Sequence, residues 1–119
     1  MLNFIKKRIK SIRYASKGAY LLIFTEASIK VQFFIATAVT VLGLMVGLSK
    51  TEWILQILTI AIVLSVEGLN TAIEKLADFV HPGYHEKIGF VKDVAAGAVF
   101  ITALAAVSVG LIIYLPKFF

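Results

Sequence analysis

The sequence contains no cysteine. Disulfide bonds and thiolate metal sites are therefore excluded, and the redox compartment cannot be read from the chain. The sequence also lacks a Gly-x-x-x-x-Gly-Lys phosphate loop and the motifs of protein kinases, so any nucleotide site must follow another design. Polar sequence is scarce as well, because 60% of the 119 residues are apolar and the mean hydropathy is +0.93. This composition is far more apolar than that of a soluble domain, and it leaves no room for a separate one.

Long apolar runs predict that the chain crosses a membrane. Val31–Ser49 and Val94–Pro116 carry no charge, and each is long enough to span a bilayer, which takes about 20 residues. A third run begins at Trp53, is apolar as far as Val66, and then turns acidic. We therefore predict an all-α integral membrane protein with one domain over residues 1–119. The expected spans are residues 31–49, 53–80 and 94–115.

The N-terminal residues 2–24 predict an amphipathic helix at the membrane surface. Ile5, Ile9 and Ile12 form an apolar stripe, and a second stripe is basic. Six of the twelve basic residues lie in the first seventeen positions: Lys6, Lys7, Arg8, Lys10, Arg13 and Lys17. A basic end beside a span favours anionic lipid headgroups and a cytosolic N-terminus; a solvated basic face without a ligand is the alternative. Nucleic acid is not expected as a partner, because no aromatic platform accompanies the charge.

Three connections separate the expected helices. A polar hinge, Thr25–Lys30, precedes the first span. The second connection, Ser49–Glu52, is very short, so the first two spans should form an antiparallel hairpin. Gly43 and Gly47, in the first span, permit close helix packing, within the chain or between chains. His81-Pro82-Gly83 should end the next helix, and a polar loop should continue to the third span.

Residues 66–80 carry the polar stripe around which the chain is organised. At about 100° per residue, Glu67, Asn70, Glu74 and Asp78 share one arc of roughly 80° on a helix. Aligning like charges at the end of a membrane span is unfavourable unless something positive lies among them. The simplest compensation is a bound cation such as Mg²⁺, which takes one or two carboxylates together with nucleotide phosphates. The alternative is a solvated collar of helix-end charges or internal ion pairs.

Helix geometry places Glu67 inside the membrane near one face. It lies ~21 Å from Trp53, within a hydrocarbon core of ~30 Å, whereas Glu74 reaches the interface at ~31 Å. With a cytosolic N-terminus, this face is the cytosolic one, where ATP is present. The three-span topology should bring charged residues from three regions to it: Glu26, Glu67, Glu74, Asp78, Lys92 and Asp93. Such a set suits Mg²⁺-assisted phosphoryl transfer from ATP to a lipid alcohol.

Several motifs follow one another along the chain. They are Tyr14-Ala-Ser-Lys-Gly18, Glu26, Glu67-Gly-Leu-Asn-Thr-Ala-Ile-Glu74, Asp78, Tyr84-His85 and Lys92-Asp-Val-Ala-Ala-Gly-Ala98. Together they resemble the bacterial diacylglycerol kinase and undecaprenol kinase family over nearly the whole chain. The resemblance implies a homotrimer in the bacterial inner membrane, with active sites shared between neighbouring subunits.

The same resemblance implies a role for each site residue. Glu67 would be the catalytic base beside the lipid, and Glu26 and Glu74 would bind the metal. The nucleotide contacts would be Tyr14, Glu26, Glu74, Tyr84, His85, Lys92 and Asp93, and the supporting residues Asn70 and Asp78. Lys7 falls near the lipid and the nucleotide, where the family often has an arginine whose guanidinium fork lysine lacks.

The sequence leaves two questions open. The lipid is either undecaprenol or diacylglycerol: Ala15-Ser16 and the segment after Glu26 depart from the better-known branches, whereas residues 70–75 and 92–98 look closer to the undecaprenol branch. A different class of function is a small oligomeric transporter or channel subunit with Glu67 as an ion or proton relay. A scaffold subunit with structural ion pairs is a third alternative.

Overall fold

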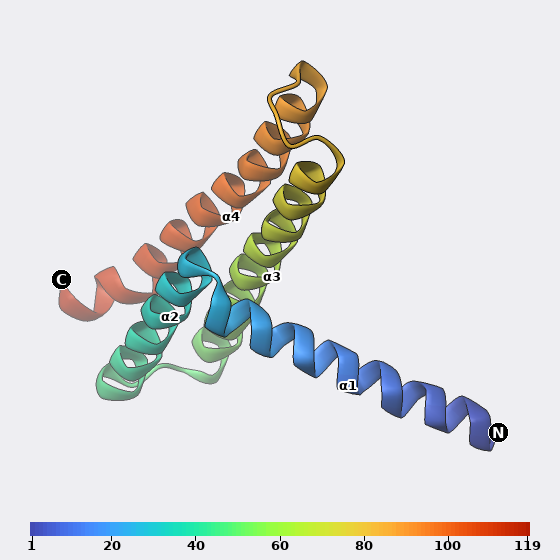
Figure 1. The fold of residues 1–119 in the computed structure, drawn as a ribbon. Helices are drawn as coiled ribbons and strands as arrows, with labels where there is room; N and C mark the ends of the chain where they lie inside the picture. Colours follow the sequence, from blue (N-terminus) through green and yellow to red (C-terminus); the bar gives the residue numbers. More distant parts are fainter.

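Four helices make up the structure, a computed structural model that describes all 119 residues (Figure 1). In chain order they are α1 (Leu2–Thr25), α2 (Ala27–Val46), α3 (Lys50–Val80) and α4 (Glu86–Phe118). The last three are each long and apolar enough to cross a membrane. The predicted all-α fold with three candidate spans is therefore confirmed.

Very little of the chain is shielded from its surroundings. Only seven of the 119 residues are buried, and large apolar side chains are exposed on every helix. A water-soluble monomer does not expose apolar surface on this scale. In lipid, by contrast, a helix satisfies its own backbone hydrogen bonds while its apolar side chains contact acyl chains. The exposed faces of α2, α3 and α4 are therefore suited to lipid or to other membrane-embedded chains.

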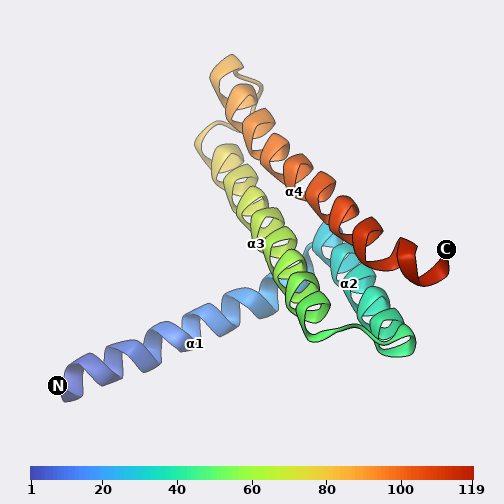
Figure 2. The same cartoon turned by 180° about the vertical axis from the view of Figure 1, so that it is seen from behind.

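The helices α3 and α4 form the frame of the molecule and lie side by side, antiparallel, along much of their length (Figures 1 and 2). The shorter α2 lies beside the first half of α3 and forms the predicted antiparallel hairpin with it. The 31 residues of α3 and the 33 of α4 extend ~46 Å and ~50 Å at the rise of an α-helix. Both lengths exceed a hydrocarbon core of ~30 Å, so part of each helix extends beyond it.

The helix α1 projects away from the bundle, and none of its residues is buried (Figures 1 and 2). Near its C-terminal end the side chain of Leu22 packs on Gly68 of α3, where an added Cβ would lie 2.6 Å from a leucine methyl carbon. Only Glu26, with extended φ and ψ of −99° and 123°, separates α1 from α2. The predicted hinge Thr25–Lys30 is therefore too long. Residues 27–30 contain no glycine or proline, so nothing in them opposes the first turn of α2.

A capping box begins α3. The Ser49 hydroxyl accepts from the backbone N–H of Glu52 (3.1 Å), and the Glu52 carboxylate accepts from the backbone N–H of Ser49 (2.9 Å). Lys117, near the end of α4, forms an ion pair with the same carboxylate at 3.1 Å. Residues 50–52 thus belong to the first turn of α3 and not to the loop, because the cap satisfies the free N–H groups of that turn. The contacts among Ser49, Glu52 and Lys117 therefore join the start of α3 to the end of α4.

Gly43 and Gly47 have different roles, although they share the spacing of a helix-packing motif. A Cβ at Gly43 would lie 2.9 Å from Leu48, 3.0 Å from Trp53 and 3.1 Å from the Tyr114 hydroxyl. Gly47 contacts nothing within 4 Å and ends α2 with a positive φ of 76°, which glycine adopts at little cost. Close packing is therefore confirmed for Gly43 alone, and Gly47 makes the turn of the hairpin.

We expect Gly43→Ala to lower the free energy of unfolding by about 1–3 kcal/mol, because the added methyl group overpacks this contact. The measurement is unfolding of the protein in detergent, followed by the fluorescence of Trp53, the single tryptophan. Gly97→Ala is the matched control, since Gly97 lies within α4 with open space around it. That change should be neutral or stabilise the helix by up to ~1 kcal/mol. Equal destabilisation by both would contradict the assigned contact.

The loop between α3 and α4 is shorter than predicted. As expected, α3 ends just before His81-Pro82-Gly83, but α4 begins at Glu86 and not near Val94. The prediction of a polar loop as far as the third span is therefore wrong. The physical reason is a local cap, since the His85 ring accepts from the backbone N–H of Lys87 at 3.1 Å and Glu86 favours the positive end of the helix dipole.

Candidate functional site

Glu67 is the buried carboxylate of the polar stripe on α3. Only 8% of the residue is exposed, and none of the three ion pairs of the chain involves it. A buried, ionised carboxylate without a partner is strongly unfavourable. The Glu67 carboxylate is therefore suited to meet a hydroxyl or a cation that comes from outside the chain.

Asn70 and Glu74 form a pair one turn further along α3. The Asn70 amide donates to one oxygen of the Glu74 carboxylate at 3.2 Å. This bond orients the carboxylate and leaves its other oxygen available to a ligand. The amide oxygen of Asn70 is itself buried without a hydrogen-bonding partner, so the pair retains two acceptor atoms for groups not in the chain.

Glu26 reaches this end of α3 through an ion pair with Lys75, at 3.2 Å between Nζ and Oε1. The pair links the residue between α1 and α2 to the segment that follows Glu74. The three-span topology predicts Glu26 at this face, but Lys75 is not among the predicted site residues. No local pattern identifies this lysine, because the contact depends on how α2 crosses α3.

Asp78 and Lys92 connect α3 to α4. The lysine donates to the aspartate across the two helices. Asp93 follows on α4 as an exposed residue and takes part in no ion pair. The predicted convergence on one end of α3 therefore holds for Glu26 and Lys92.

Tyr84 and His85 lie in the short loop at the same end of the bundle. Tyr84 is 87% exposed, and its ring lies against Gly89. The Nδ1 atom of His85 accepts from a backbone N–H, so the ring carries its proton on Nε2 and can donate it to an anionic group. The His81 ring lies 5.3 Å from that of His85, centroid to centroid. His81 is not among the predicted site residues.

The structure does not bring Tyr14 and Lys7 to Glu67 within one chain. Both lie on α1, which points away from α3 beyond the Leu22 contact (Figure 1). Along the helix they are ~12 Å and ~22 Å from Leu22. Tyr14 is 62% exposed, with the Lys10 ammonium 5.9 Å from the centre of its ring.

The carboxylates fit Mg²⁺ in kind, though no group of three or more acidic or histidine side chains gathers in one chain. Mg²⁺ often takes only one or two protein carboxylates, and phosphate oxygens and water complete its octahedron. The free carboxylate oxygen of Glu74 is of the kind that Mg²⁺ takes. The Glu26 carboxylate is of the same kind, but in this structure it is paired with Lys75.

Comparison with known proteins reveals close relatives. Residues 13–114 match the family model described as prokaryotic diacylglycerol kinase. Undecaprenol kinase of Bacillus subtilis (strain 168) is 36% identical over 115 residues, 97% of this chain and 94% of that protein. A diacylglycerol kinase of Synechocystis is 36% identical over 107 residues, 89% of this chain and 61% of that protein. Diacylglycerol kinase of Escherichia coli (strain K12) is 30% identical over 99 residues, which is 83% of this chain and 81% of that protein. The family match includes every predicted site residue except Lys7.

Proposed function

Since the chain belongs to the prokaryotic diacylglycerol kinase family, and is therefore a multi-pass membrane lipid kinase that uses ATP, we propose that Glu67 is its general base. We further propose that it phosphorylates a lipid alcohol at the cytosolic leaflet of the bacterial inner membrane. Membership of a kinase family sets aside the transporter and scaffold alternatives. The observation that carries the proposal is the burial of Glu67, without a partner, beside the Asn70–Glu74 pair.

The chemistry follows from the position of Glu67. A lipid hydroxyl approaching from the membrane reaches this carboxylate without leaving apolar surroundings. As the hydroxyl oxygen bonds to the γ-phosphorus of ATP, Glu67 accepts its proton and the bond from that phosphorus to the β-phosphate oxygen breaks. The products are the lipid phosphate and ADP. A positioned base of this kind contributes about 10²–10⁴ in rate.

Residues beyond Glu67 hold the nucleotide in this proposal. Glu26 and Glu74 would hold Mg²⁺, which offsets the phosphate charge when bound. His85 donates from Nε2 and Lys92 from its ammonium group to phosphate oxygens. Tyr84 and Asp93 complete the contacts at this end of the bundle. Asn70 orients Glu74, and Asp78 holds Lys92.

A homotrimer supplies what one chain lacks. Tyr14 and Lys7 on α1 lie away from Glu67 of their own chain, and large apolar faces are exposed. Neighbouring subunits with shared sites would set α1 of one chain beside α3 of the next. The proposed roles of Tyr14 in nucleotide binding and of Lys7 near the lipid require this arrangement.

The charge pattern supports a cytosolic active face. Six basic residues precede position 18, and Lys87 and Lys92 lie near the loop between α3 and α4. Both regions are on the side that the positive-inside rule assigns to the cytosol. The hairpin turn at Gly47 would then face outward.

We expect purified protein in mixed micelles with Mg²⁺ and ATP to phosphorylate undecaprenol in preference to diacylglycerol. The motif at residues 70–75 and the 36% identity to an undecaprenol kinase over 97% of the chain support this choice. The measurement is the amount of each lipid phosphate formed when both lipids are offered separately. Preference for diacylglycerol would reverse the lipid assignment, and no product from either lipid would overturn the proposed function.

A further inference from the structure

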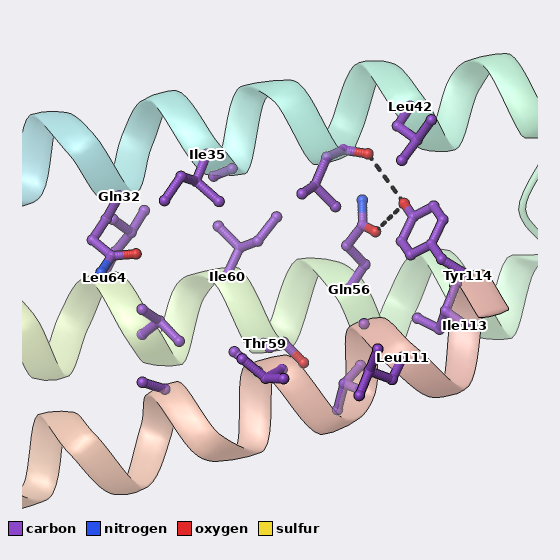
Figure 3. A pocket seen from close by; sticks show the side chains of 18 residues that line it. Gln32, Ile35, Leu42, Gln56, Thr59, Ile60, Leu64, Leu111, Ile113 and Tyr114 are labelled. Atoms are coloured by element: carbon purple, nitrogen blue, oxygen red, sulfur yellow. Dashed lines mark hydrogen bonds between the residues drawn. The ribbon is translucent and has the colours of Figure 1, made fainter.

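A cavity apart from the candidate site lies between α2, α3 and α4 (Figure 3). Its volume is about 560 Å³, within the usual range of ligand pockets. Most of its lining is apolar, including Ile35, Ile60, Leu64 and Leu111. No charged side chain lines it, so any ligand it favours must be neutral where it enters the cavity.

Gln56 places an unsatisfied amide in this apolar cavity. The residue is only 4% exposed, and its Nε2 has no hydrogen-bonding partner. Its Oε1 lies 2.5 Å from the Tyr114 hydroxyl, which is also 3.1 Å from the backbone carbonyl of Val39 (Figure 3). The hydroxyl meets only one end of the amide, whichever way round the amide lies. One buried polar atom of Gln56 is therefore left free, and such an atom is costly.

A hydroxyl group is the ligand chemistry that satisfies Gln56 in either orientation. If Nε2 is free, the hydroxyl oxygen accepts from it; if Oε1 is free, the hydroxyl hydrogen is donated to it. The other polar side chain beside Gln56 on α3, Thr59, already donates to the carbonyl of Leu55 at 2.7 Å. Gln32, at the other end of the cavity near Leu64, is only half-buried (Figure 3). Gln56 is thus the fully buried polar group of the lining that lacks a hydrogen-bonding partner.

We propose that this cavity binds a neutral long-chain alcohol, with its hydroxyl group on the Gln56 amide. The site goes beyond the proposed catalytic function, because Gln56 lies ~16 Å along α3 from Glu67 and its end of the cavity is the one near Tyr114. From there the apolar chain of the ligand runs past Ile60 to Leu64, less than one turn from Glu67. The cavity favours the neutral alcohol over its phosphate monoester, because no basic side chain lines it to pair with a phosphate.

The test is photolabelling of the full-length protein in lipid nanodiscs, without ATP, so that the result is independent of catalysis. Three probes share one isoprenoid chain with a diazirine: the free alcohol, the hydrocarbon lacking the hydroxyl, and the phosphate monoester. We expect the alcohol to label peptides of α3 and α4 that line the cavity. Gln56→Leu should weaken that labelling about tenfold, the effect of losing one buried hydrogen bond, and should leave the hydrocarbon labelling unchanged.

Two variants keep the test interpretable. Thr59→Val removes a hydroxyl from the same cavity without freeing a polar atom, so alcohol labelling should stay at the wild-type level. Tyr114→Phe deprives Gln56 of its partner in the chain and should leave alcohol labelling equal or stronger. Equal labelling by alcohol and hydrocarbon, strong labelling by the phosphate, or no effect of Gln56→Leu would overturn the proposal. Absence of alcohol labelling from the peptides that line the cavity would also overturn it and would favour a subunit contact there.

Discussion

Replacing Glu67 with glutamine should lower kcat for lipid phosphorylation by about 10²–10⁴-fold, the contribution of a positioned general base. Glutamine has nearly the same shape and fills the same buried position, but it cannot accept the proton of the lipid hydroxyl. Because the base acts in the chemical step, the Kd for ATP should not change. Both quantities can be measured on one preparation, kcat by product formation and Kd by nucleotide titration.

The matched control is Glu86→Gln, which removes a carboxylate from the first turn of α4 at the same end of the bundle. It should keep near wild-type kcat. A loss of ATP affinity in Glu67→Gln that accounts for the loss of rate would contradict the role of base and move Glu67 to the nucleotide site. Unchanged kcat would remove it from the mechanism.

Glu74→Gln should raise the Kd for Mg²⁺-ATP by about 10–100-fold. The estimate is the 1.5–3 kcal/mol that a charged partner contributes to a polar contact, at 1.4 kcal/mol for each factor of ten. Glutamine can still pair with Asn70 through its amide oxygen, so the local structure is preserved while the charge that would hold the metal is lost. The measurement is nucleotide binding at several Mg²⁺ concentrations.

If Glu74 binds the metal, the effect of Glu74→Gln on nucleotide binding should depend on the Mg²⁺ concentration. Raising the Mg²⁺ concentration should bring the Kd for ATP of Glu74→Gln closer to the wild-type value. It should not restore kcat in Glu67→Gln. If both variants bind Mg²⁺-ATP equally well, the proposed roles of Glu67 as base and Glu74 as metal ligand are wrong.

The features that sequence analysis predicted correctly depend on local pattern. Apolar runs determine which helices can span a membrane, and the helical period places Glu67, Asn70 and Glu74 on one face whatever lies around them. The stop before His81 follows from proline and glycine in the next positions. These signals need no knowledge of how the helices pack.

The features that were missed depend on contacts between distant segments or on a single cap. The start of α4 at Glu86 depends on one hydrogen bond, which the His85 ring accepts from the backbone N–H of Lys87. The pairing of Glu26 with Lys75 and that of Gln56 with Tyr114 join residues of different helices. Gly43 and Gly47 look equivalent in sequence, and only the hairpin geometry separates a packing contact from a turn. Apolar periodicity reports which face is buried but not which neighbour covers it.

The one-residue joint at Glu26 has a thermodynamic consequence. The direction of α1 relative to α2 is set where the backbone is extended, and the side chain at that point is held by Lys75. If nucleotide-bound Mg²⁺ takes the place of Lys75, binding also changes the forces on the joint and so the preferred tilt of α1 across the lipid surface. Linkage between two binding equilibria is reciprocal. If bound nucleotide changes the affinity of the basic α1 for anionic headgroups by some factor, those headgroups change the affinity for the nucleotide by the same factor. Lipid composition would then act as an effector of this protein as well as the source of its substrate.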